Sequence, residues 1–406
     1  MQLTVKVFKY LKRQFLAFLY RTADYLVPKI DNLVIFSQIR SRYSDNARAL
    51  FEYMSGDPAW QIVWLADDLH VQQQIKESLP ESRVILRKSS AGLWVSLRAR
   101  YAIITHGLGD LEFYQYKSRK KYIIQLWHGI TVKSIGILDS QLDRKLLKKY
   151  IRRETRHYDL VIASSDIERY LVAAYANIDV RKVVVTGLPR NDFLCNSNSS
   201  TNSVARLDET LRQGIKGKKV ILYAPTFRDS GTTKFFPFDD FKISELEQFL
   251  SRHNAVLLIR PHQDDFKNQE TLSSLVNSSS GDFLLAGSNE VPETADLLPF
   301  VNVIITDYSS IYIDLLLRDI PPIFIPYDLE TYQKVRGLAY DYDLITPGPK
   351  IFTQAELLKA TADALNGAPN FAEHRAFVKK MFHKYTDGRA CERVVEALKQ
   401  LPHLQT

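Results

Sequence analysis

The sequence of 406 residues contains only two cysteines, Cys195 and Cys391, and they lie far apart in the chain. This number excludes a disulfide framework and fits a protein of a reducing compartment. No cluster of Cys and His has metal-ligand spacing, and no pair of acidic residues has it clearly. We therefore expect no bound metal.

Long apolar runs are also absent. No uncharged stretch approaches the roughly 20 apolar residues that a membrane-spanning helix needs. The N-terminus lacks the layout of a signal peptide, because Lys6, Lys9, Lys12 and Arg13 interrupt any apolar core. We therefore expect a cytosolic protein.

Two common nucleotide-binding motifs are missing. No G-x-G-x-x-G followed by a ribose-binding acid occurs, which disfavours a dinucleotide enzyme. No G-x-x-x-x-G-K-S/T occurs either, which disfavours a P-loop NTPase. We expect no cofactor.

The charge balance is positive: 54 Lys and Arg against 46 Asp and Glu give a net charge of +8. This excess favours anionic partners such as phosphorylated substrates, acidic lipid surfaces or nucleic acid. The charge is spread along the chain, and no nucleic-acid recognition motif is evident, so a non-catalytic binder of membranes or nucleic acid is a minor alternative. The length and the ordinary globular composition predict two or three domains.

Residues 1–30 form a segment of their own, in which apolar residues recur at helical spacing among cations. A basic amphipathic helix of this kind can lie in a membrane interface, with its cations on anionic lipid. The alternative is a helix that packs its apolar face on the protein's own domain. The residues concerned are Phe8, Leu11, Phe15, Phe18 and Leu19, among Lys6, Lys9, Lys12, Arg13 and Arg21.

From residue 32 onward, short β-rich runs alternate with helical segments in two series. The first series comprises Asn32–Ser37, Gln61–Leu65, Arg83–Leu86, Tyr101–Thr105, Tyr122–Leu126, Leu160–Ala163 and Lys182–Thr186. The second comprises Lys219–Tyr223, Ala255–Arg260, Asp282–Ala286, Val301–Thr306 and Pro322–Ile325. Between them, the polar stretch Cys195–Asn202 is typical of a linker. Near-continuous apolar strands alternating with helices predict parallel sheets covered on both faces.

The sequence thus predicts an α/β fold of two parallel-sheet domains that face a central cleft. We expect domains at 31–200 and 201–370, after the segment 1–30 and before a C-terminal helix at 371–406 that packs back across the junction. The C-terminal strand ends would face the cleft, where open α/β sheets bind ligands.

The stretch Ile304–Arg318 is the most informative one. A buried strand ends at Thr306, and Asp307 or Ser309 can cap the helix that follows. Ser309 and Ser310 add hydroxyl donors beside the free N–H groups of that helix, which favours a phosphate. The alternative is an ordinary capped helix.

A histidine follows a strand of the first domain in Gln125–Gly136. His128 suits a general base, and Gly129 after it allows a close backbone approach. Lys133 could meet a phosphate. The alternative is a core histidine bonded to backbone.

Two strands of the second domain are followed by cationic or proton-active side chains, in Tyr223–Asp229 and Leu258–Gln263. Arg228 and Arg260 suit bidentate phosphate contacts, although Arg260 could instead serve a structural ion pair. His262 is a second candidate acid/base or phosphate donor.

The segment Tyr327–Pro349 is dense in Tyr and Asp and contains Arg336–Gly337. It could hold a base and ribose, or it could be a packed connector. Together, the strand-end motifs of the two domains would meet across one cleft, which suggests a diphosphate-containing donor and a transfer that needs a base.

From about Tyr43 to Pro349 the chain resembles the CDP-glycerol glycerophosphotransferase family, whose members prime or polymerise teichoic acids and related phosphate polymers. The motifs that carry the resemblance are Tyr43–Met54, Leu126–Gly136, Gly187–Asp192, Tyr223–Asp229, Arg260–His262, Ile305–Leu317 and Tyr327–Pro349.

This resemblance implies a GT-B architecture of two Rossmann-like domains, with the acceptor on 31–200 and the CDP donor on 201–370. It implies a peripheral enzyme at the cytoplasmic face of the membrane. A homo-oligomer is a separate option, which the resemblance does not address. The enzyme would move glycerol phosphate or ribitol phosphate from a CDP-activated donor to a lipid-linked saccharide or polymer acceptor and release CMP. A primase, or a capsule enzyme adding few units, fits as well as a processive polymerase.

The resemblance also implies roles for single residues. His128 matches the proposed base for attack on the donor's β-phosphorus, and His262 matches a second essential histidine. The residues expected near the donor phosphates are Arg228, Asp307, Ser309, Ser310, Arg260, Lys133 and Arg336, and those expected on the acceptor side are Gly129 and Asn46.

One departure from the family concerns the wall beside the base. The family usually has Thr-Pro after His-Gly, whereas Ile130, Thr131 and Val132 stand here before Lys133. An alternative function on the same fold is a glycosyltransferase that uses a nucleotide sugar and releases a nucleoside diphosphate.

Overall fold

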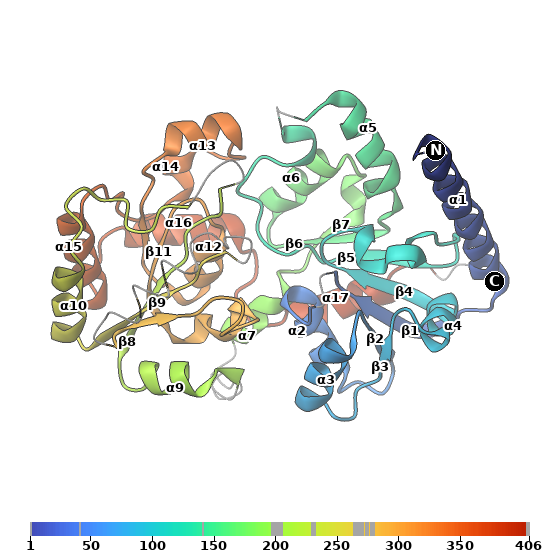
Figure 1. The fold of residues 1–406 in the computed structure, drawn as a ribbon, viewed down its shortest axis with the longest axis horizontal. Helices are drawn as coiled ribbons and strands as arrows, with labels where there is room; N and C mark the ends of the chain where they lie inside the picture. Colours follow the sequence, from blue (N-terminus) through green and yellow to red (C-terminus); the bar gives the residue numbers. More distant parts are fainter. Residues whose placement is uncertain are drawn as a thin grey trace.

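The computed structural model describes residues 2–39, 42–139, 142–195, 206–228, 233–262, 272, 276 and 281–402, with 2–13 and 112–115 as backbone only. It has two lobes, each built on one parallel sheet (Figure 1). The predicted α/β class with two parallel sheets is confirmed, and each stretch predicted to be a strand contains one.

The first lobe contains a seven-stranded sheet in the order β3-β2-β1-β4-β5-β6-β7. All neighbouring strands are parallel, with Ile35 of β1 level with Val63 of β2 and Ala102 of β4. The strands are β1 (Ile30–Ser37), β2 (Gln61–Ala66), β3 (Val84–Leu86), β4 (Ala99–Ile104), β5 (Tyr122–Gln125), β6 (Leu160–Ala163) and β7 (Val183–Val185). The helices are α1 (Gln2–Leu26), α2 (Asp45–Met54), α3 (Leu69–Ser78), α4 (Ser90–Arg98), α5 (Arg144–Arg153), α6 (Asp166–Ala176) and α7 (Asp192–Cys195).

The second lobe contains a five-stranded parallel sheet in the order β10-β9-β8-β11-β12. Its strands are β8 (Lys219–Tyr223), β9 (Ala255–Ile259), β10 (Phe283–Leu285), β11 (Val301–Thr306) and β12 (Pro322–Phe324). Its helices are α9 (Glu209–Ile215), α10 (Ile243–Arg252), α12 (Ile311–Leu315), α13 (Leu329–Val335), α14 (Tyr342–Ile345), α15 (Gln354–Leu365) and α16 (Ala372–Phe382). Buried apolar side chains of β8, β9 and β11 form the centre of its core.

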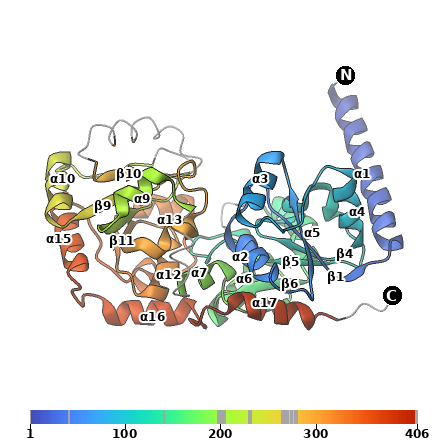
Figure 2. The ribbon, with the colours of Figure 1, turned by 90° about the horizontal axis from the view of Figure 1, so that it is seen from below.

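Two helices, rather than one, occupy the C-terminal stretch, because the chain turns at Gly388, which has a φ of +66°. α16 packs on the second lobe, and α17 (Ala390–Lys399) packs on α2 of the first (Figure 2). Of the expected linker, Cys195 is the last residue of α7, and 196–202 lie outside the described residues.

Helix α1 packs one face on the first lobe. Tyr20 Oη lies 2.8 Å from Ser96 Oγ, and the fully buried Asp24 carboxylate accepts from Lys121 Nζ at 2.6 Å and Lys29 Nζ at 2.8 Å. The opposite face exposes Phe15, Phe18, Leu19 and Leu26. The side chains of Lys6, Phe8, Lys9, Leu11, Lys12 and Arg13 lie outside the described residues. No helix in the described part of the chain combines the length and the apolar character needed to cross a bilayer.

Candidate active site

A cavity of about 690 Å³ lies between the two lobes at the C-terminal ends of their strands. Its first-lobe wall includes Arg42, Asp45, His106, His128 and Arg190, and its second-lobe wall includes Arg260, His262, Glu293, Ser309, Ser310, Asp314 and Arg336. In parallel α/β sheets the C-terminal strand edge is where ligands bind. The prediction that the strand-end motifs of the two lobes meet across one cleft therefore agrees with the structure. The predicted residues that line the cavity include His128, His262, Arg260, Ser309, Ser310 and Arg336.

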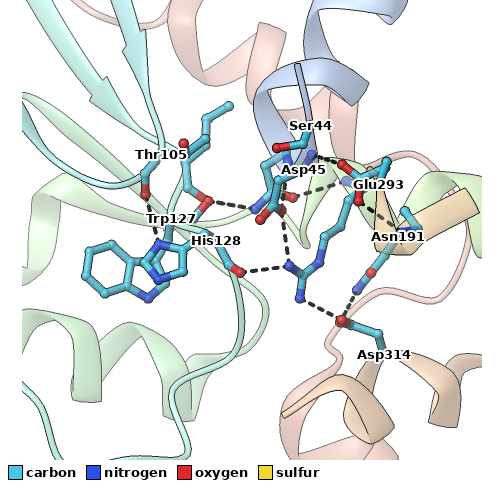
Figure 3. A network of polar contacts seen from close by, with 12 residues as sticks. Ser44, Asp45, Thr105, Trp127, His128, Asn191, Glu293 and Asp314 are labelled. Atoms are coloured by element: carbon cyan, nitrogen blue, oxygen red, sulfur yellow. Dashed lines mark hydrogen bonds and ion pairs between the residues drawn. The ribbon is translucent and has the colours of Figure 1, made fainter. Parts of the chain in front are cut away.

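His128 is placed by a turn directly after β5 (Figure 3). Trp127 has a φ of +56°, a left-handed conformation that is strained for a bulky residue. The buried Asn46 holds this turn, because its Nδ2 donates to the Leu126 carbonyl at 3.1 Å and the Trp127 carbonyl at 2.9 Å. Asn46 therefore lies behind the base rather than on the lining of the cavity.

The ring of His128 has a fixed hydrogen-bonding direction. Its Nδ1 lies 3.1 Å from the carbonyl oxygen of Thr105 (Figure 3). A carbonyl can only accept, so Nδ1 carries the proton, and in the neutral ring Nε2 holds the lone pair. The imidazole is exposed to the cavity, so Nε2 is suited to take a proton from a bound hydroxyl.

His106 is a cavity residue that the sequence analysis did not name. It follows β4, and its ring stacks on His128 with a centroid distance of 4.6 Å and an interplanar angle of 5°. Its Nδ1 lies 2.9 Å from Thr105 Oγ1. The signal was present in the sequence, because His106–Gly107 follows a strand just as His128–Gly129 does, and the two strands are neighbours.

Arg190 is a second residue that was missed as a site residue. Its Nη1 donates to the His128 carbonyl at 2.8 Å and to Asp45 Oδ1 at 3.1 Å, and its Nη2 donates to Asp314 Oδ2 at 2.6 Å. Burial opposes the charged form, but the carboxylates of Asp314 and Asp45 raise the pKa of Arg190 above its usual value. Arg190 therefore ties the backbone of the base to α12 in the second lobe.

Further carboxylates of the second lobe contact α2 of the first. Arg48 pairs in a bidentate manner with Asp296, at 2.8 and 3.1 Å. The backbone N–H of Asp45 donates to Glu293, whose pKa is raised by burial. These contacts and the Arg190 pairs hold the lobes against each other beside the cavity.

Ser309 and Ser310 lie where β11 passes into α12. Helix α12 begins after Ser310, whose side chain makes no cap bond, and Ser309 Oγ accepts from Ile311 N–H at 3.5 Å. A Cβ placed on Gly129 would lie 3.6 Å from Ser310 Oγ, so these two residues face each other across the cleft. The expected cap from Asp307 is wrong, because its carboxylate accepts from the backbone N–H of Thr226 at 2.8 Å instead.

Arg228 and Asp307 lie behind the cavity wall and not on it. The buried Arg228 guanidinium pairs with Asp307 at 2.9 Å and with Asp328 at 2.8 Å, and it lies 5.0 to 5.2 Å from the ring centres of Tyr308, Tyr327 and Tyr332. Burial disfavours its charge, but hydrogen bonds to Asp328 and the charge of Asp307 raise its pKa. These partners direct Arg228 away from a ligand in the cavity.

Three further predicted site residues, Arg260, His262 and Lys133, have different surroundings. Arg260 donates to the Val291 carbonyl at 3.0 Å and to the Ala286 carbonyl, and burial lowers its pKa to about 10. His262 stacks on Phe227 at 5.3 Å. Lys133 is not on the cavity lining, and its backbone forms an antiparallel bridge with Leu338. Of the motifs quoted above, Asp229 and Gln263 lie outside the described residues.

Comparisons with known proteins agree with the fold and with the family that the motifs resemble. The family model for CDP-glycerol:poly(glycerophosphate) glycerophosphotransferase matches residues 19–400. A teichoic acid glycerol-phosphate transferase of Staphylococcus aureus is 26% identical, over 90% of this chain and 92% of the relative. The teichoic acid ribitol-phosphate polymerase TarL of the same organism is 29% identical, over 94% of this chain but 64% of the relative.

A solved structure of the wall teichoic acid polymerase TagF has the same fold. It superimposes with a TM-score of 0.75 at 21% identity, over 98% of this chain and 95% of that one. The chain therefore shares the GT-B-like fold of this structure, with Rossmann-like parallel-sheet domains.

Proposed function

The chain belongs to the CDP-glycerol:poly(glycerophosphate) glycerophosphotransferase family, and we propose that it transfers a polyol phosphate from CDP-glycerol or CDP-ribitol to an acceptor hydroxyl. The products are a new phosphodiester and CMP. The transfer serves the synthesis of teichoic acid or a similar polymer, in line with the names of the relatives. The acceptor is a lipid-linked saccharide or a growing polymer.

One observation carries this proposal: the hydrogen-bonded ring of His128 faces cations and serines of the other lobe across one cavity. Nε2 of His128 takes the proton of the acceptor hydroxyl as its oxygen attacks the donor's β-phosphorus. The bond from that phosphorus to the bridging oxygen breaks, and CMP leaves with the electron pair. His262 supplies a hydrogen bond or proton to the departing phosphate.

The other cavity residues bind and orient the donor. Arg260 and Arg336 offer guanidinium groups to the diphosphate, and Ser309 and Ser310 offer hydroxyl donors. Such preplaced donors stabilise charge that moves onto the leaving phosphate. Gly129 lets the acceptor approach the base.

Four predicted site residues have supporting roles in this proposal. Asn46 fixes the turn that carries the base, and Arg228 with Asp307 fixes the loops after β8 and β11. Lys133 joins the loop after the base to the other lobe through its backbone. The proposal uses no cofactor, and no group of His, Cys, Asp or Glu among the described residues is arranged to hold a metal.

The test is CMP release from CDP-glycerol and, separately, from CDP-ribitol in the presence of a lipid-linked disaccharide acceptor. We expect release from one donor, and a loss of about 10²–10⁴-fold in His128→Ala. His70→Ala is the matched control, because His70 is exposed on α3 and is not among the cavity-lining residues. No CMP from either donor, or full activity in His128→Ala, would refute the proposal.

We further propose that the first lobe binds the cytoplasmic face of the membrane through α1 and α5. Helix α1 exposes aromatic side chains, and α5 exposes six cations on ten residues: Arg144, Lys145, Lys148, Lys149, Arg152 and Arg153. Two further exposed cations, Arg21 of α1 and Arg156 just after α5, lie near His157, whose pKa is lowered to about 4 by burial and by nearby positive charges. Cations beside exposed aromatic rings suit an anionic lipid interface.

Co-sedimentation with vesicles that contain anionic phospholipid tests this proposal. The double variant Phe15→Ser/Phe18→Ser removes side chains that are 62% and 64% exposed, and it should weaken sedimentation without changing activity on a soluble acceptor. Phe352→Ser is the control, since this side chain is 60% exposed on the other lobe. Equal sedimentation of all three proteins would contradict a role for α1.

A further inference from the structure

The segment that follows the base crosses to the other lobe. Ala339 N–H donates to the Val132 carbonyl at 2.8 Å, and Ser134 N–H donates to the Gly337 carbonyl at 3.1 Å. With the bridge between Lys133 and Leu338, these bonds form a short antiparallel ladder. The ladder connects the loop behind His128 with the loop that begins at Arg336, and both of these residues line the cavity.

A buried carboxylate lies beneath this ladder. Glu168 of α6 is buried, and its Oε1 accepts from the backbone N–H of Thr131 at 2.7 Å. Two tyrosines lie near this carboxyl group, Tyr175 from α6 and Tyr340 from the second lobe. Burial and the charge of Glu168 raise the pKa of both hydroxyls. The Tyr340 hydroxyl is buried and has no hydrogen-bond partner in the described part of the chain.

The same segment is clamped to α6 at its far end. Gly136 has a φ of +58°, and a Cβ there would lie 2.3 Å from the Tyr175 carbonyl oxygen. Only glycine allows this approach. The segment is therefore fixed on α6 by backbone packing at Gly136 and by the hydrogen bond from the Thr131 N–H to the Glu168 side chain.

Burying a carboxyl group without an ion pair is costly, and here burial raises the pKa of Glu168 to about 7. An apolar side chain of the same length would fill the space without that cost. Such an apolar side chain could not accept a hydrogen bond, so the Thr131 N–H would be buried without an acceptor.

We propose that Glu168 is a positioning residue of the transfer reaction, which fixes the segment Ile130–Ser134 through the Thr131 amide and thereby sets His128 and Arg336 at their separation across the cleft. This inference rests on the proposed function for its kinetic consequence. The structural consequence, a fixed segment Ile130–Ser134, is independent of the proposed function.

Two variants of equal size separate the hydrogen bond from the packing. Glu168→Gln keeps an acceptor oxygen for Thr131, whereas Glu168→Met keeps the length and removes the acceptor. Asp192→Asn is the matched control, because Asp192 is a largely buried carboxylate, with a pKa raised by burial, that accepts from the backbone N–H groups of Ala390 and Cys391 and is not among the cavity-lining residues.

Amide hydrogen exchange of the full-length protein is the first readout. We expect peptides covering 130–134 to exchange at least about tenfold faster in Glu168→Met, and at the wild-type rate in Glu168→Gln and Asp192→Asn. This measurement needs no turnover. It therefore tests the positioning of the segment even if the wild-type protein releases no CMP, an outcome that would instead refute the proposed function.

Steady-state CMP release is the second readout. Glu168→Met should lower kcat at least about tenfold and raise the donor KM several-fold, while Glu168→Gln stays within about threefold of wild type. Equal kinetics and exchange in the Met and Gln variants would overturn the inference. So would a Glu168→Met protein that is unfolded beside a folded Gln variant, since this would assign Glu168 to the stability of the lobe alone.

Discussion

Replacement of Glu168 by Gln should remove a pH dependence of stability from the first lobe. Burial raises the pKa of this carboxyl from 4.5 to about 7, so the folded state binds its proton more tightly than the unfolded state does. The stabilisation from the bound proton is complete below pH 4.5 and is lost as the pH rises through 7. A difference of about 2.5 between the pKa values corresponds to ~3.4 kcal/mol, of which ~2.5 kcal/mol falls between pH 5 and pH 8.

The assay is urea unfolding of wild type and Glu168→Gln at pH 5 and pH 8, followed by tryptophan fluorescence. All four tryptophans, Trp60, Trp64, Trp94 and Trp127, lie in the first lobe, so the signal reports on the lobe that contains Glu168. Other titrating groups are common to both proteins and cancel in the comparison. From pH 5 to pH 8, the free energy of unfolding of wild type should fall by about 2.5 kcal/mol more than that of Glu168→Gln. A difference between the two proteins below about 0.5 kcal/mol would refute the conclusion that burial raises the pKa of Glu168.

Three further predictions concern side chains around the cavity. His106→Phe keeps a flat ring on His128 and should retain kcat within about threefold, whereas His106→Ala should lower it by about tenfold; equal CMP release by the two variants would show that the stacking is irrelevant. Arg190→Gln leaves Asp314 buried without its cation and should lower the free energy of unfolding by about 3–5 kcal/mol, and a second change, Asp314→Asn, should recover part of the loss in the same urea titration. Arg228→Lys loses the bidentate pair with Asp328 and should lower the Tm while the donor KM stays within about twofold; a tenfold rise in KM would instead place this side chain on the donor phosphates.

The strands and the gathering of strand-end residues could be predicted, because both follow from local sequence and from the geometry of parallel sheets. Buried β-rich runs fix where strands form. Once the strands are parallel, His128, His262 and Ser309 must come to matching sheet edges. This reasoning needs no knowledge of contacts between distant residues.

The direction of the arginines could not be predicted in this way. Arg228 turns toward Asp328, which lies 100 residues away in the sequence, and Arg190 toward Asp314, which lies 124 residues away. Whether a guanidinium faces a cavity or a buried carboxylate depends on such tertiary partners, and no local pattern encodes them. His106 differs, because its strand-end position resembles that of His128 and could have been recognised.

The attachment of α1 has a consequence for how the enzyme stands on a surface. The Asp24 carboxylate on this helix pairs with the fully buried Lys121, so detaching α1 from the lobe would break a buried ion pair. Helix α1 is thus a fixed part of the first lobe and not a flexible tether. A bilayer that bound Phe15 and Phe18, as proposed above, would therefore also set the tilt of the first lobe and the height of the cavity above the headgroups.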